Sequence, residues 1–299
     1  MKIPLLCCLT LTFCASASFA QQMAITFDDL PAHNALPPDV TRLQVATSIL
    51  TTLATEHMPP TYGFVNGAKA KDPDTVSVLQ AWRDAGQPLG NHTWAHLDFN
   101  DLTVRQFEAE IAKNEPLLKH YMRGEDWHWF RYPYLHEGQT VEKVRTARSW
   151  LKAHGYKVAQ VTMDFEDYLW NAPYARCVDK HDEAAIAKLH DSYLSTASQY
   201  LDLARELSHM IYGRDINYVL LMHVGAFDAK MLPDLLALYR RAGLKFTTLA
   251  EAEQDPAYRD DEGLASMQGG DLLEQMMQRR HLKFPPNTKP YKELDQTCR

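Results

Sequence analysis

The residue types and spacing of this chain suggest metal chemistry at two histidines and two adjacent aspartates. His92 and His96 are four residues apart, so on a helical turn both imidazoles face the same side and can reach one ion. Asp28 and Asp29 follow the strand-like run 24–27, where one carboxylate could bind the ion and the other serve as a base. An Asp-His-His site with an open position is the layout of a hydrolytic metal centre.

The histidine spacing alone does not decide between a metal site and ordinary histidines. The chain contains 13 His, and a pair four residues apart arises often by chance in such a sequence. The metal interpretation therefore depends on the residues that accompany the pair and on the elements that would bring them together.

Strand-like and helix-like segments alternate along most of the chain. Such alternation implies a parallel sheet. We expect a distorted (β/α) barrel of about seven parallel strands, although an open doubly wound sheet would also gather the strand ends along one edge. The strand-like segments are residues 24–27, 61–65, 87–90, 127–130, 156–163, 217–222 and 244–248.

Most of these strand-like segments end in a polar side chain. The carboxyl ends of the strands gather at one face of a parallel barrel, which is where such barrels place their chemistry. The side chains could therefore converge on one site. They are Asp28, Asn66, His92, Arg131, Asp164 and His223.

Two of the expected helices carry specific expectations. One begins at a capping box in residues 103–106 and contains Pro116, which should kink or split it. Another has Val141, Val144, Ala147 and Leu151 as its apolar positions.

The first 20 residues have the composition of a secretory signal. The apolar run 3–13 is too short to span a bilayer, and the small residues Ser18 and Ala20 suit cleavage after Ala20. We therefore expect a secreted or periplasmic protein without a stable membrane anchor. The net charge of −7 argues against nucleic acid as a partner.

Two of the five cysteines remain after such cleavage. In an oxidising compartment Cys177 and Cys298 are expected to pair, with two separate buried thiols as the alternative. The bridge would join two segments that break the strand–helix rhythm. These are a helical insertion at about residues 169–216 and a polar C-terminal extension, residues 253–299, with a short helical piece at 272–281.

Five ordered motifs resemble those of the polysaccharide deacetylases, also called the NodB homology family or carbohydrate esterase family 4. The resemblance covers about residues 23–251, so residues 21–252 would form the catalytic domain. Each motif is weak alone, but five in order, each at an expected strand end, make coincidence improbable. They are Thr26-Phe27-Asp28-Asp29, His92-Thr93-Trp94-Ala95-His96, Arg131-Tyr132-Pro133-Tyr134, Asp164-Phe165-Glu166-Asp167-Tyr168 and Leu220-Leu221-Met222-His223.

The resemblance implies a metal site and a base. Asp29, His92 and His96 would hold one divalent ion, usually zinc, with cobalt, nickel or manganese as alternatives. Asp28 would be the general base that takes a proton from the attacking water. Arg131 would hold Asp28 ionised, because a charge-assisted hydrogen bond lowers the pKa of a carboxylate.

The resemblance also implies how the acetyl group is released. The backbone N–H of Tyr134 would help to stabilise the oxyanion, and His223 would protonate the departing amine. Asp167 would keep His223 cationic. The alternatives are a structural ion pair for Arg131 and Asp167, a satisfied core histidine for His223 and a packing role for Tyr134. His33 and His136 lie on loops next to motif residues and are interpreted as ordinary loop histidines, with contact to substrate or metal as the alternative.

The chain departs from the family pattern at the rim of the site. Leu30-Pro31 and Leu135 stand where the family commonly has glycine, and Tyr168 stands where tryptophan is usual. The expected function is removal of an acetyl group, N-acetyl or O-acetyl, from a glycan. The alternatives are hydrolysis of another C–N bond in a small amide or imide, and non-catalytic glycan binding.

Overall fold

The computed structural model describes residues 21–261 and 263–299, so the expected signal segment and its cleavage site lie outside the described residues. A seven-stranded sheet occupies the centre, and all of its strand pairs are parallel. The order is β5-β4-β3-β2-β1-β6, with β7 also paired to β1. The strands are β1 Gln22–Leu30, β2 Gly63–Val65, β3 Leu89–Asn91, β4 Trp129–Phe130, β5 Lys157–Val158, β6 Tyr218–His223 and β7 Lys245–Phe246.

The sheet curls back on itself as a distorted barrel. β5 is much shorter than the expected strand over residues 156–163, but the chain beyond it rejoins the sheet through a parallel bridge between Met163 and Leu220. There the N–H of Leu221 donates to the Met163 carbonyl at 3.1 Å. This bridge connects β6 to the far edge of the sheet, which confirms the barrel rather than the open doubly wound alternative.

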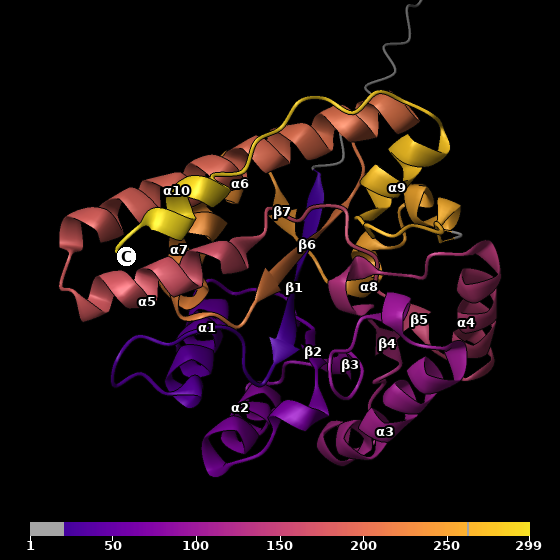
Figure 1. The fold of residues 1–299 in the computed structure, drawn as a ribbon, viewed down its shortest axis with the longest axis horizontal. Helices are drawn as coiled ribbons and strands as arrows, with labels where there is room; N and C mark the ends of the chain where they lie inside the picture. The colour runs from indigo at the N-terminus through magenta and orange to yellow at the C-terminus, as the bar shows by residue number, and fades with distance from the viewer. Residues whose placement is uncertain (1–20, 262) are drawn as a thin grey trace, which may run out of the picture.

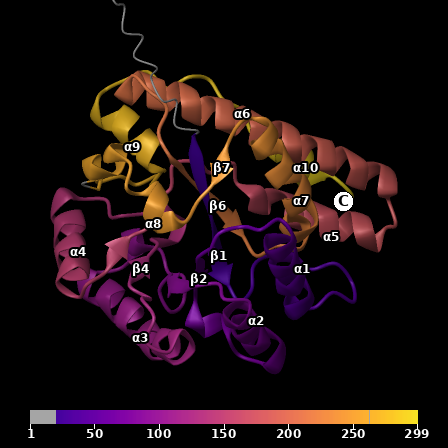
Figure 2. The same ribbon diagram turned by 180° about the vertical axis from the view of Figure 1, so that it is seen from behind.

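Helices surround the sheet, with β1 and β6 at the centre of the molecule in both ribbon views (Figures 1 and 2). Short 3-10 turns occur at the strand ends. The α-helices are α1 Arg42–Thr55, α2 Pro73–Asp84, α3 Val104–Met122, α4 Val141–Ala153, α5 Asn171–Asp179, α6 Glu183–Tyr212, α7 Ala226–Arg241, α8 Leu249–Ala252, α9 Leu272–Arg279 and α10 Tyr291–Gln296.

Two expectations about the helices require correction. α3 is one continuous helix of 19 residues in spite of Pro116, because Phe107 and Leu118, on either side of the proline, are anchored in the core. Val141 is the first residue of α4 and is 76% exposed, whereas Val144 is buried. Packing against the barrel therefore begins one turn into α4.

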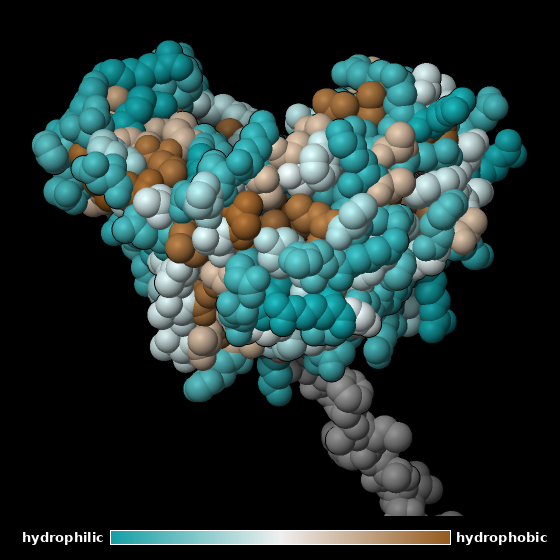
Figure 3. Space-filling model, turned by 90° about the horizontal axis from the view of Figure 1, so that it is seen from below, coloured by the Kyte–Doolittle hydropathy of each residue, from teal (hydrophilic) through white to brown (hydrophobic). Residues whose placement is uncertain are grey.

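The insertion and the C-terminal extension cover one side of the barrel. The long α6 runs along the edge of the molecule, and the C-terminal segment follows it to α10 (Figure 1). α9 buries Leu272, Leu273, Met276 and Met277 in the same core as the sheet. The extension, expected to be polar, thus contributes an amphipathic helix whose apolar side packs into the core. The space-filling view shows a mainly hydrophilic face with small hydrophobic patches and a notch between two raised lobes (Figure 3).

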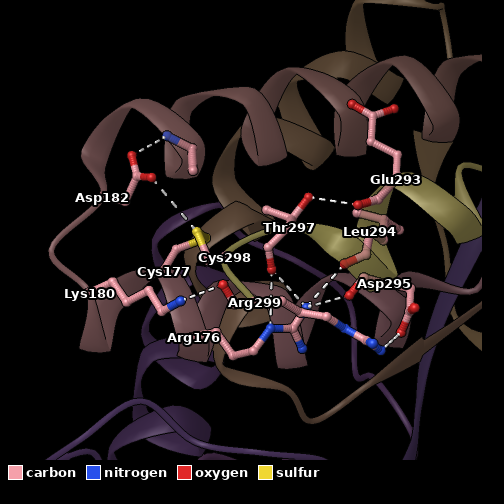
Figure 4. Close-up of a disulfide and its surroundings, with 11 residues drawn as sticks. Arg176, Cys177, Lys180, Asp182, Glu293, Leu294, Asp295, Thr297, Cys298 and Arg299 are labelled. Carbon is pink, nitrogen blue, oxygen red and sulfur yellow. Dashed lines mark hydrogen bonds and ion pairs between the residues drawn. A yellow bond between two sulfur atoms is a disulfide. The ribbon is translucent and has the colours of Figure 1, made fainter.

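Cys177 of α5 and Cys298 form the expected disulfide, with their Cα atoms 5.2 Å apart (Figure 4). The Arg176 side chain strengthens the same junction by donating to the carbonyls of Thr297 and Leu294 at 2.8 and 3.1 Å. Within the described ranges, none of the helices is both long enough and apolar enough to cross a membrane.

Replacing both disulfide cysteines with serine should destabilise the protein by about 2–5 kcal/mol, because the bridge closes a long loop and so restricts the unfolded chain. The sequence separation is 121 residues. Urea unfolding under non-reducing conditions would measure the loss. Reduced wild-type protein is the control and should unfold at the same lower midpoint, while an unchanged midpoint in the variant would contradict the prediction.

Candidate active site

β1 and β6 bring the first and fifth motifs together. The two strands pair in parallel register, with Asp28 of β1 opposite His223 of β6. β1 extends through the aspartate pair to Leu30, so the pair lies inside the strand rather than after it. Asp29 has a left-handed backbone with φ of 69°, which turns the chain where the site begins.

The two histidines converge, but not on a helical turn. Residues 92–96 form a loop in which Thr93 and His96 have left-handed backbone angles of 63° and 56°. Glu110 of α3 holds this loop, because its backbone carbonyl accepts from the N–H of Trp94 at 3.0 Å and its side chain accepts from the N–H of Ala95 at 2.8 Å. The expectation of a helical turn was therefore wrong, although the imidazole rings still lie 4.9 Å apart.

Asp29, His92 and His96 face one point. Asp29 Oδ1 lies 3.4 Å from His96 Nε2 and 3.9 Å from His92 Nε2. One ligand atom from each residue lies within 4.8 Å of the others, a spacing that could hold a metal ion. The three residues come from β1 and from the loop after β3, as their strand-end positions predicted.

The chemistry of these donors fits a divalent ion. His92 Nδ1 donates to the Arg131 carbonyl at 2.8 Å, so its Nε2 keeps a free lone pair toward Asp29. Burial lowers the pKa of His92 and of His96 to about 3, so both imidazoles are neutral. One carboxylate and two neutral imidazoles form a common donor set for zinc.

Two further residues contact Asp29; the sequence offered His33 only as the less favoured alternative and did not place Lys69 in the site. His33 Nδ1 lies 2.5 Å from Asp29 Oδ2, and Lys69 Nζ lies 2.8 Å from Asp29 Oδ1. Burial alone would raise the pKa of Asp29, but these neighbours hold it well below its usual value. The interpretation of His33 as an ordinary loop histidine is wrong. Its position on the loop directly after the first motif was the signal in the sequence.

Arg131 holds Asp28 as expected. Its Nη1 donates to both Asp28 oxygens at 3.2 Å, while its Nε donates to the Ala159 carbonyl at 2.6 Å. Asp28 is only 2% exposed, and this burial raises its pKa above the usual value although Arg131 acts in the opposite direction. The net direction differs from the expected lowering. A carboxylate with a raised pKa is a stronger base for protons.

Asp167 holds His223 on the other side of Asp28. One Asp167 oxygen accepts from His223 Nδ1 and the other from the His223 backbone N–H, both at 2.7 Å. Burial alone would lower the pKa of His223, but the Asp167 carboxylate raises it to about 10. Arg131 and Asp167 thus have different partners, and the alternative of an ion pair between them is wrong.

Tyr134 lies at the open side of the Asp29-His92-His96 group. Its ring is 57% exposed and packs edge-on against His96 with 4.5 Å between ring centroids. Tyr134 and Leu135 both have left-handed backbones, with φ of 59° and 54°. His136 pairs with Asp98 at 2.9 Å and also lines the cavity.

A cavity of about 420 Å³ is lined by most of these side chains, whereas the fully buried Arg131 and Asp167 do not line it. Asp164 lines it, and burial raises the pKa of this carboxyl to about 6. Asn66 instead supports the histidine loop, since its side chain donates to the His92 carbonyl. One wall comes from the C-terminal extension, which the sequence did not associate with the site. The wall residues are Gln268, Gly270, Asp271, Glu274 and Lys289.

Residues 18–159 match the sequence profile of a family described as polysaccharide deacetylase. No curated protein sequence matches the chain. Similar solved structures include a chitin deacetylase from Colletotrichum lindemuthianum, 20% identical, covering 77% of this chain and 86% of that one at a TM-score of 0.55.

Two other solved structures share the fold. A carbohydrate esterase family 4 domain of a xylanase, from the hindgut metagenome of Trinervitermes trinervoides, is 16% identical over 79% of this chain and 91% of its own, with a TM-score of 0.52. A family 4 pseudoenzyme from Bacillus anthracis is 15% identical over 78% of this chain and 65% of its own, with a TM-score of 0.53.

Proposed function

We propose that this chain, a member of the polysaccharide deacetylase family through residues 18–159, is a metal-dependent hydrolase. It would remove acetyl groups, chiefly N-acetyl, from a carbohydrate. The observation that carries the proposal is the position of Asp28. It lies beside the Asp29-His92-His96 group, with His92 Nε2 3.7 Å from Asp28 Oδ2, and opposite His223 in the sheet register. The proposed base, metal ligands and acid all line one cavity.

Asp29, His92 and His96 would hold the ion. When bound, a divalent ion there supplies Lewis acidity, which lowers the pKa of water and polarises a carbonyl oxygen. Zinc suits the donor set, and cobalt, nickel or manganese would serve the same chemistry. His33 and Lys69 fix the orientation of Asp29 through the two oxygens of its carboxylate.

Asp28 would take the proton of the attacking water. Its burial makes it a better base, and the Arg131 guanidinium keeps both of its oxygens in place. On the other side His223, held by Asp167, would donate a proton to the departing amine. The backbone N–H of Tyr134, at the open side of the cavity, would stabilise the developing oxyanion.

A hydrolysis assay tests this function directly. Zinc-loaded protein should release acetate from N-acetylated chitooligosaccharides, and removal of the ion with a chelator should stop the release until zinc is restored. O-acetylated xylan and small acetamides or cyclic imides are the comparison substrates. Faster hydrolysis of the small amides would favour the other C–N hydrolase. Glycan binding without turnover by the metal-loaded protein would contradict catalysis.

Replacing Asp167 with Asn should move the alkaline limb of the pH–rate profile to lower pH. The acid form of His223 is required, and the wild-type pKa of about 10 keeps it protonated through neutral pH. Without the carboxylate, burial lowers the pKa of His223. As the pH rises, the variant should therefore lose its activity at a lower pH than the wild-type protein does. The profile of kcat against pH measures this shift.

Asp228→Asn is the matched control for that experiment. Asp228 is also a fully buried carboxyl near the insertion, but it bonds to Asn171 and Tyr193. Burial raises its pKa well above the usual value, and its hydrogen bonds go to Asn171 and Tyr193 rather than to His223, so its replacement should leave the alkaline limb in place. Equal shifts in both variants would show that the effect is not specific to the Asp167–His223 pair.

A further inference from the structure

Gly269 in the C-terminal extension contacts the loop that carries Tyr134. A Cβ atom at position 269 would lie 2.5 Å from His136 Cδ2, 2.8 Å from the Leu135 carbonyl oxygen and 3.0 Å from that of Tyr134. Real Cβ atoms are not found this close to other heavy atoms. Gly269 itself has a left-handed φ of 65°, which also favours glycine. Only glycine therefore allows this approach.

The loop that Gly269 contacts has a backbone that needs support. Tyr134 and Leu135 are consecutive non-glycine residues in the left-handed region, which costs free energy at each position. Such a conformation persists only where surrounding structure holds it. The Leu135 and Tyr134 carbonyls are, after the His136 ring, the atoms that a Cβ at position 269 would meet first, so a side chain there would press on the backbone of the loop.

Gly269 is fixed on both sides by hydrogen bonds to the barrel. Before it, the Ser266 N–H donates to the Gly138 carbonyl at 3.0 Å and the Asn100 side chain donates to the Met267 carbonyl at 3.2 Å. After it, the Leu272 N–H donates to the Val161 carbonyl at 2.7 Å. The segment is therefore anchored rather than laid loosely over the site, and Gln268 and Gly270 line the cavity on either side of Gly269.

We infer that Gly269 is a positioning residue for deacetylation: it holds the Tyr134–Leu135 backbone so that the Tyr134 N–H faces the oxyanion. The inference rests on the proposed function for the role of that N–H. The positioning itself depends only on the contacts with the loop. The C-terminal extension is thus a part of the active site that acts through the loop of the third motif.

Gly269→Ala should lower kcat by roughly 10- to 100-fold with little change in zinc affinity, because a small misplacement of a reacting group has effects of this size and the metal ligands are untouched. Hydrogen exchange of the peptide over residues 131–138 should become faster. Kinetics, zinc titration and exchange mass spectrometry measure these changes. Unchanged exchange and unchanged kcat would overturn the inference.

Gly243→Ala is the matched control. Gly243 also has a left-handed backbone, with φ of 88°, but nothing lies within 4 Å of a Cβ added there. It should therefore carry the same kind of backbone strain while keeping the wild-type kcat and the wild-type exchange of residues 131–138. An equal fall in kcat in both variants would show that the cause is general destabilisation, and it would overturn the inference.

Two further variants keep the test decisive. His136→Ala combined with Gly269→Ala removes the nearest obstacle but leaves the two backbone carbonyls, so kcat should stay below that of His136→Ala alone. Recovery to that level would overturn the inference.

If Gly269→Ala does not fold, Asn100→Ala loosens the segment instead and should speed exchange of the loop. If wild-type protein has no deacetylase activity, the proposed function fails, while the exchange data still decide the positioning.

Discussion

Replacing Asp28 with Asn is expected to lower kcat for acetate release by about 10²–10⁴-fold, the range typical for loss of a general base. Asn has nearly the same shape as Asp and can still accept from Arg131, but it cannot take a proton from water. The hydrogen bonds of the Asp28 carboxylate are with Arg131, and Asp28 is not one of the three proposed ligands, so those ligands should remain in place. The variant should bind zinc as tightly as wild type.

Steady-state kinetics and zinc titration of the same Asp28→Asn sample measure the two quantities. Thermal unfolding is the control, since the variant leaves the buried Arg131 charge without its carboxylate and should be somewhat less stable. A variant that is folded, zinc-loaded and fully active would show that the assigned base is wrong. Loss of zinc together with activity would instead make Asp28 a metal ligand.

Removing a residue that only orients a metal ligand costs roughly 10- to 100-fold in metal affinity. Replacing His92, which is itself a proposed ligand, with Ala is expected to weaken zinc binding by more than this. Hydrolysis should fall with it. His92 supplies one of three donors, and its Nε2 is oriented by the hydrogen bond from Nδ1 to the Arg131 carbonyl. Competition with a chromophoric chelator measures the affinity.

His154→Ala is the matched control for the His92 variant. His154 Nδ1 also bonds to a backbone carbonyl, that of Trp150 at 2.8 Å, but the side chain is exposed at the end of α4. Its replacement should leave zinc affinity and hydrolysis unchanged. Retention of tight zinc binding by His92→Ala would contradict the metal site as assigned.

The residues that converge could be predicted because they stand at the ends of parallel strands. Asp28 and His223 meet through the register of β1 and β6, which brings their side chains to one edge whatever the loops do. The conformation of the His92–His96 loop could not be predicted. Between its left-handed residues, Thr93 and His96, the backbone N–H groups of Trp94 and Ala95 donate to Glu110 of α3, a contact between segments that no local pattern shows.

The wall of the cavity could not be predicted for a related reason. Gly269 and Lys289 lie in a polar stretch without a strand or long helix to signal its position. Lys289 is held by Glu166 at 2.9 Å, again a pairing of remote segments. Motifs therefore located the residues proposed as ligands, base and acid, whereas the shape of the site depends on tertiary contacts made by residues between and after the motifs.

The position of the wall has a consequence for biosynthesis. Asp28 emerges from the ribosome early, whereas Gly269 and the bridge partner Cys298 emerge among the last residues of this sequence. The barrel strands can pair before the cavity has its last side. Residues 266–272 bond to parts of the chain that were made earlier. A nascent chain should therefore bring its proposed metal ligands together before it can position its Tyr134 loop. Turnover should begin only after synthesis passes Leu272.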